Sequence, residues 1–147
     1  MNPFYESLIQ KTKAITEGVP YRISNLANTA AMLWEAMPDI NWAGFYLLEG
    51  DKLILGPFQG KVACTEIAIG KGVCGTAAKT LTTQVVADVH EFPGHIACDA
   101  DSRSEIVIPL FDNNGDLFGV LDIDSPVLNR FSKEDKEGLE EIAVILD

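Results

Sequence analysis

Apolar positions recur with helical spacing at both ends of the chain and with strand spacing between them. Residues 4–18 and 23–38 place apolar side chains three or four positions apart, which predicts two amphipathic helices. Pro38 ends the second, and residues 131–146 predict a last helix with Ser132 as its N-cap. The residues expected on the core side of the first two helices are Phe4, Leu8, Ile15, Ile23, Leu26, Ala30, Leu33, Trp34 and Met37.

The middle of the chain reads mainly as hairpins. Two hairpins are predicted at 41–58 and 104–125, with turns at a Glu-Gly-Asp and an Asn-Asn-Gly sequence. Between them lie a third strand at 62–69, a short helix at 72–81 and a short strand at 84–89. This order predicts a single α+β domain over residues 1–147, with an antiparallel sheet of about six strands. We expect the N-terminal and C-terminal helices to flank that sheet on one face.

Composition narrows the class of protein. The chain has 147 residues, of which 47% are hydrophobic and 22% charged, as in an ordinary globular domain. Its net charge of −11 argues against a nucleic acid or an anionic membrane as partner, since both require a basic surface. The first residues lack the basic and apolar parts of a secretory signal, so a cytoplasmic location is expected.

Alternation along the strands separates their two faces. Trp42 and Tyr46 share one face of a strand that is apolar on both sides, so this strand should be central in the sheet. Near the end of the second hairpin, Phe118, Val120, Asp122 and Asp124 fall on one face. Such acids can simply mark the end of a strand that extends beyond the core into solvent. Because the opposite face stays apolar, we favour a polar pocket at the strand end.

The chain has three cysteines, which cannot form a fully paired disulfide framework. Cys64 falls in the predicted third strand, where a small buried core residue is the simplest reading. Cys74 starts the short helix, and a helix N-terminus lowers the pKa of a thiol. Cys98 lies in an acidic loop, where a thiol gains little from burial. From the residues alone, core packing, metal binding and redox chemistry all stay open.

A zinc site is the alternative that the histidines suggest. His90, His95 and Cys98, which lie in the same loop, could supply ligands for a tetrahedral ion, and so could the three cysteines with one histidine. Their spacings lack the paired C-x2-C element of structural zinc sites. We therefore assign no metal and no cofactor, and interpret the histidines as surface residues.

Four segments resemble the free methionine-(R)-sulfoxide reductases, which are single-domain GAF proteins. They read NWAGFYLL, GPFQGKVACTEIAIGKGVCGTAA, VADVHEFPGHIACDADSRSEIVIPL and GVLDIDSP, and the resemblance covers essentially the whole chain. The three cysteines stand 10 and 24 residues apart within these segments, a feature that GAF domains in general do not share. The GAF fold that the resemblance implies agrees with the α+β prediction.

The resemblance also implies roles for individual residues. Cys98 matches the nucleophile that attacks the sulfoxide sulfur, Cys64 the resolving cysteine that bonds to it, and Cys74 a third cysteine that could resolve or relay. The matched substrate-pocket residues are Trp42, Tyr46, Glu105, Asp122 and Asp124. Carboxylates crowded together cannot all ionise, so one should keep a proton for the sulfoxide oxygen, and we assign that acid role to Asp124.

These roles predict an enzyme that reduces free L-methionine (R)-S-oxide to L-methionine and is recycled by thioredoxin or a similar dithiol. The acidic loop would be a mobile flap that carries Cys98 to the pocket. A homodimer is a further expectation, because GAF domains often pair through helices. Two rivals remain: a GAF module that senses a small ligand without catalysis, and a zinc protein.

Overall fold

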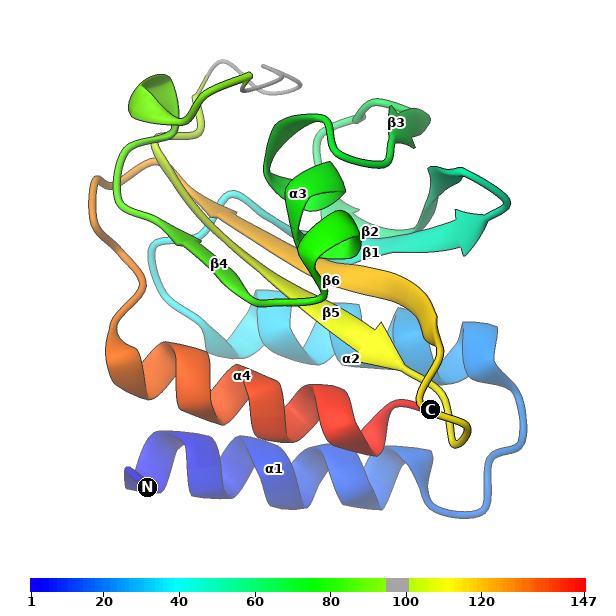
Figure 1. Ribbon diagram of the computed structural model, residues 1–147. Coiled ribbons are helices and arrows are strands. Elements are labelled where there is room, and N and C mark those ends of the chain that lie inside the picture. The colour runs from blue at the N-terminus through cyan, green and yellow to red at the C-terminus, as the bar shows by residue number, and fades with distance from the viewer. Residues whose placement is uncertain (95–100) are drawn as a thin grey trace.

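A six-stranded antiparallel sheet forms the centre of the computed structural model, which describes residues 1–94 and 101–147 (Figure 1). The strand order is β3-β2-β1-β6-β5-β4, so β1 and β6 are central, and the α+β prediction is confirmed. The described strands are β1 Trp42–Glu49, β2 Lys52–Gly60, β3 Glu66–Ala68, β4 Gln84–Val86, β5 Ser104–Phe111 and β6 Leu117–Ser125. The described helices are α1 Pro3–Thr16, α2 Arg22–Ala36, α3 Gly72–Thr80, the 3₁₀ helix η1 Val89–Glu91 and α4 Lys133–Ile145.

Helices cover both faces of the sheet, and those from the two ends of the chain share one face as expected. In Figure 1, α2 and α4 lie against one face with α1 beneath them, and α3 lies against the other. The larger apolar core fills the first side and includes Leu33, Phe45 and Leu121. A smaller cluster around Val73, Ala77 and Val120 fills the side of α3. No face was predicted for α3, and its interface with the sheet is where polar residues can be enclosed.

Capping residues fix the ends of the terminal helices. The Asn2 side chain accepts a hydrogen bond from the backbone N–H of Tyr5, and Pro3 stands in the first turn of α1. Ser132 caps α4 as predicted, in a capping box completed by Asp135. Three residues expected in the core of α1 and α2 lie on the surface instead: Phe4, Ile23 and Trp34 are 39%, 58% and 38% exposed.

Strand alternation holds for β1 and for most of β6. Ala43 and Phe45 face the larger core, while Trp42 and Tyr46 face α3. In β6, Phe118 departs from prediction because it packs in the larger core, away from the face of Val120. The register of β5 with β6 shifts between Leu110 and Phe111, which places an extra residue at Phe118.

The predicted third strand is shorter than its sequence suggested. Only Glu66–Ala68 pairs with β2, and Cys64 precedes the strand in a loop, so its assignment to the strand is wrong. Two carbonyl groups of this loop are hydrogen-bonded by side chains from β1 rather than by a neighbouring strand. Among the described residues, no helix has the length and apolar character needed to span a membrane.

Candidate active site

Three acidic side chains meet on the face of the sheet that α3 covers. Glu105 of β5 lies directly opposite Asp124 of β6 in the antiparallel register. Asp122, two residues earlier in β6, points to the same face and pairs with Val107 on one side and Gly44 on the other. Neighbouring strands therefore bring together acids that lie 17 and 19 positions apart in the sequence.

Two of the three acids are buried, and Glu105 is hydrogen-bonded to both of the others. Glu105 is 7% exposed and Asp122 is 5% exposed. Burial, reinforced by the charges of Asp122 and Asp124 and by hydrogen bonds to both, raises the pKa of Glu105 well above its usual range. Carboxyl groups can bond to each other only if one carries a proton. The cluster of Glu105, Asp122 and Asp124 therefore holds a proton near neutral pH.

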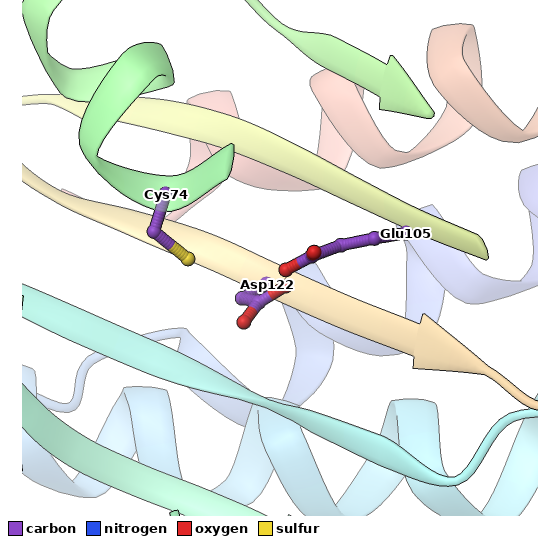
Figure 2. A group of neighbouring side chains, drawn as sticks. All are labelled: Cys74, Glu105 and Asp122. Atoms are coloured by element: carbon purple, nitrogen blue, oxygen red, sulfur yellow. The ribbon is translucent and has the colours of Figure 1, made fainter. Parts of the chain in front are cut away.

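Cys74 approaches this cluster from the opposite layer. Figure 2 shows its sulfur, from the first turn of α3, pointing toward the space beside Asp122 and Glu105. One ligand atom from each of these three residues lies within 4.8 Å of the others. Burial, followed by the charges of Asp122 and Glu105, raises the pKa of the Cys74 thiol well above its usual value. This effect outweighs the lowering of the pKa that the N-terminus of α3 would cause, so the Cys74 thiol is neutral.

The spacing of Cys74, Glu105 and Asp122 would also suit a metal ion. A metal would require these atoms without their protons. The hydrogen bonds that link Cys74 and Glu105 to Asp122 require protons on the same atoms. The donor set therefore fits a proton-holding cluster better than a metal centre. Of the candidate zinc ligands in the acidic loop, His90 is exposed, with its ring Nδ1 3.1 Å from Asp88, and His95 and Cys98 lie outside the described residues.

Aromatic rings form the wall beside the acids. The rings of Trp42 and Tyr46 stack with centroids 5.9 Å apart, and Phe58 of β2 stacks on Trp42 at 5.2 Å. A side chain at Gly44 would collide with Phe58, since an added Cβ would lie 2.3 Å from the Phe58 Cβ. Gly44 therefore lets the three rings close together above the strand.

The same wall holds the loop that carries Cys64. The Trp42 indole donates to the carbonyl of Lys61 at 3.1 Å, and the Tyr46 hydroxyl donates to the carbonyl of Cys64 at 2.9 Å. Cys64 is disulfide-bonded, whereas Cys74 is a free buried thiol. Cys98, the predicted nucleophile, lies outside the described residues. Just after that segment, Asp101 accepts a hydrogen bond from the Lys61 ammonium at 2.9 Å.

A pocket lies between the acids, the aromatic wall and the start of α3. Six residues singled out in the sequence line it: Trp42, Tyr46, Cys74, Glu105, Asp122 and Asp124. Ser102, Val62 and Ala63 also line it and were not predicted. Phe58 was missed because the register of β1 with β2 shifts between Gly44 and Tyr46, so counting outward from the turn pairs the wrong residues. Ser102 carries no signal in the sequence.

The fold and this pocket agree with comparisons to known proteins. The GAF domain family model matches residues 18–146, so the chain is a GAF-domain protein. It is 54% identical over 144 residues to the free methionine-R-sulfoxide reductase of Escherichia coli (strain K12), covering 98% of this chain and 87% of the relative. The free methionine-R-sulfoxide reductase of Saccharomyces cerevisiae is 47% identical over 149 residues, covering 97% and 83%.

The chain is also similar to a solved structure. The fRMsr of Staphylococcus aureus in complex with substrate aligns with a TM-score of 0.92 and 53% identity, covering 97% of this chain and 92% of that one. The chain therefore belongs to the family of the free methionine-R-sulfoxide reductases, which are oxidoreductases, and the resemblance drawn from the cysteine-bearing segments is confirmed.

Proposed function

We propose that the protein reduces free L-methionine (R)-S-oxide to L-methionine with its own thiols. The observation that carries this proposal is the pairing of a buried acid cluster with an aromatic wall that also anchors the loop of disulfide-bonded Cys64. Its relatives in Escherichia coli and Saccharomyces cerevisiae are free methionine-R-sulfoxide reductases. The preference for the R epimer rests on those relatives.

The proposed reaction has two thiol steps. The Cys98 thiolate attacks the sulfoxide sulfur and forms an S–S bond, while the sulfoxide oxygen takes up a proton. The hydroxyl group then moves to the cysteine sulfur as the S–O and S–S bonds break, which releases methionine and leaves Cys98 as a sulfenic acid. The sulfur of methionine gains two electrons and Cys98 loses them. The Cys64 thiol then attacks the sulfenic acid, forming a disulfide and releasing water. The disulfide-bonded state of Cys64 and the free state of Cys74 support Cys64 as the resolving thiol.

The sulfoxide oxygen needs a proton as its bond to sulfur breaks. The acid cluster can supply one, because two carboxylates about 4 Å apart repel by about 4 kcal/mol at an effective dielectric near 20. We assigned the donor role to Asp124. The raised pKa of Glu105, which is hydrogen-bonded to Asp124, supports a shared arrangement in which Glu105 stores the proton and Asp124 delivers it.

The pocket explains a preference for a free amino acid over a methionine residue within a protein. A free amino acid carries an α-ammonium, which the ionised members of the cluster can pair with. Trp42 and Tyr46 offer apolar surface for the S-methyl group and the side-chain methylenes. A methionine residue in a peptide has no α-ammonium, so it cannot balance the negative charge of the site.

A dithiol is required to complete the cycle, and thioredoxin is the proposed donor. It reduces the disulfide by thiol exchange and is itself oxidised. The decisive experiment supplies each epimer of free methionine sulfoxide together with thioredoxin, its reductase and NADPH. We expect NADPH oxidation with the R epimer alone. Turnover of both epimers would overturn the stereospecific proposal, and turnover of neither would overturn the reductase activity.

Two variants test the order of the thiol steps. Cys98→Ser should abolish methionine release in a single turnover without reductant. Cys64→Ser should still release one methionine per molecule, but should not form the disulfide. Counting free thiols separates the reductase from a ligand-sensing GAF module, because the reductase loses two thiols on adding the R epimer and a sensor loses none. Single-turnover release by the Cys98 variant would contradict the mechanism.

A further inference from the structure

Cys74 is the buried pocket thiol that the proposed reaction does not use. It lies in the first turn of α3, is 4% exposed, and directs its sulfur into the acid cluster (Figure 2). By sequence resemblance it could be a second resolving thiol or a relay. Its surroundings argue for a different role, because a redox thiol has to become a thiolate and be reached by another sulfur.

Acids approach Cys74 from the strands packed against α3. Glu105 comes from β5, Asp122 and Asp124 come from β6, and Tyr46 presents its hydroxyl group from β1. Among the described residues that line the pocket, Lys71 at the start of α3 carries the one positive charge, and this residue is exposed. A thiolate in this position would face three carboxyl groups with little access to solvent. The sulfur therefore keeps its hydrogen and can donate one hydrogen bond, which Asp122 accepts.

We propose that Cys74 is a positioning residue whose S–H group donates to Asp122 and thereby keeps the shared proton of the cluster on Glu105 and Asp124. The inference rests on the proposed reductase function and deepens it. The S–H donor stabilises the ionised form of Asp122 relative to its protonated form. Asp122 then serves as the acceptor for the thiol and for Glu105. The proton stays on Glu105 or Asp124, which lie opposite each other on β5 and β6, and Asp124 in turn lies opposite Trp42 of β1.

Loss of the donor should redistribute that proton. Without S–H, ionised Asp122 is less stable and competes with Glu105 and Asp124 for the proton. A fraction of the molecules then carries the acid at the wrong carboxyl group. The fully deprotonated cluster is also less stable, so the last proton is lost at a higher pH. We therefore expect a lower kcat together with a shift of the pH profile of kcat, in which activity is lost on the alkaline side at a higher pH.

Cys74→Ala and Cys74→Ser in the full-length protein test this inference. Serine keeps a hydrogen-bond donor at nearly the same place, and alanine removes it. For Cys74→Ala we expect kcat to fall about tenfold, the rate equivalent of one net hydrogen bond. Its alkaline limb should move up by about one pH unit. Cys74→Ser should retain kcat within about threefold and keep the limb in place.

A second measurement does not depend on activity. The protonated thiol has an S–H stretching band in the infrared, which Cys74→Ser identifies by its absence. We expect the band of reduced wild-type protein to persist at alkaline pH and to shift in Asp122→Asn, where the acceptor is weaker. After one turnover, mass spectrometry of alkylated peptides should find Cys74 reduced.

Three results would overturn the inference. Equal loss of multiple-turnover activity in both Cys74 variants, with single turnover preserved, would indicate a redox role. Loss in Cys74→Ala with the alkaline limb unmoved would indicate packing alone, and equal activity of both variants with wild type would indicate no role. If the wild-type protein releases no methionine from the sulfoxide, the proposed function fails instead, which a wild-type control run in parallel reveals.

Discussion

Two buried acids with almost equal exposure, Asp135 and Glu105, have opposite surroundings. Asp135 is 8% exposed and Glu105 is 7% exposed. Asp135 accepts hydrogen bonds from the Tyr5 hydroxyl at 2.6 Å, from Arg130 at 3.1 Å and from the Ser132 backbone at 2.7 Å. Its charge is matched by a cation and by several donors, as is usual for a buried carboxylate.

Glu105 has acids as its hydrogen-bonding neighbours. Asp122 and Asp124 both bond to it and both raise its pKa. The carboxyl group therefore keeps its proton, and the fold loses free energy at neutral pH by holding it. The comparison teaches that burial alone does not make an acid functional. A buried acid that is fully paired stabilises the fold, while one placed among other acids stores a proton at the expense of stability.

The largest expected effect separates the two acids by activity. Glu105→Gln removes the stored proton, and we expect kcat/KM to fall by about 10²- to 10⁴-fold, the usual range for a lost general acid. Steady-state assays with the R epimer give this value. The matched control is Asp135→Ala, which should keep activity per folded molecule within about twofold, because Asp135 lies outside the pocket. Comparable losses in both variants would contradict the division into two roles.

The second prediction concerns stability, for which we expect Asp135 to matter more than Glu105. Asp135→Ala leaves the Arg130 guanidinium without its carboxylate in a largely buried site, so the free energy of unfolding should fall by about 3–5 kcal/mol. Urea denaturation followed by circular dichroism measures it. Glu134→Ala, at an exposed position in the same helical turn, is the control and should lose less than about 1 kcal/mol. Equal losses in the two variants would show that the pairing of Asp135 with Arg130 does not add to the stability of the fold.

A third prediction concerns the donors. Tyr5→Phe removes one hydrogen bond to a carboxylate, and the free energy of unfolding should fall by about 1.5–3 kcal/mol. Tyr46→Phe removes a bond to the neutral carbonyl of Cys64, so its loss should be only about 0.5–1.5 kcal/mol. The same denaturation experiment compares both. A larger loss for Tyr46→Phe would show that anchoring the Cys64 loop matters more to the fold than completing the Asp135 network.

The change that is smallest at any one pH step is a slope of stability with pH. The pKa of Glu105 is raised on folding from 4.5, so between that value and the folded pKa the folded state binds one more proton than the unfolded state. Wild-type stability therefore falls as pH rises through this window, and Glu105→Gln lacks this contribution. We expect the variant to gain about 1.4 kcal/mol over wild type per pH unit. Thermal unfolding of both at several pH values measures it, and a constant difference would contradict the raised pKa.

Local rules were enough to predict most of the elements, the two faces of β1 and most of those of β6. The spacing of Asp122 and Asp124 on an otherwise apolar strand indicated a polar pocket, and Ser132 was identified as a cap. Which acids meet is a matter of strand register, and two register shifts moved Phe58 and Phe118 from the places that simple counting gives them. Pattern also could not place α3, because a short helix with small apolar residues fits either face of a sheet.

The sheet ends on both sides in a very short strand. β3 and β4 each have three residues and form its two edges. Long edge strands leave rows of unpaired main-chain groups that recruit strands from other molecules, and short edges limit this. The long strands β1 and β6 are paired with neighbours on both sides along most of their length, so they present no such edge. We expect the two short edge strands to limit the addition of strands from other molecules.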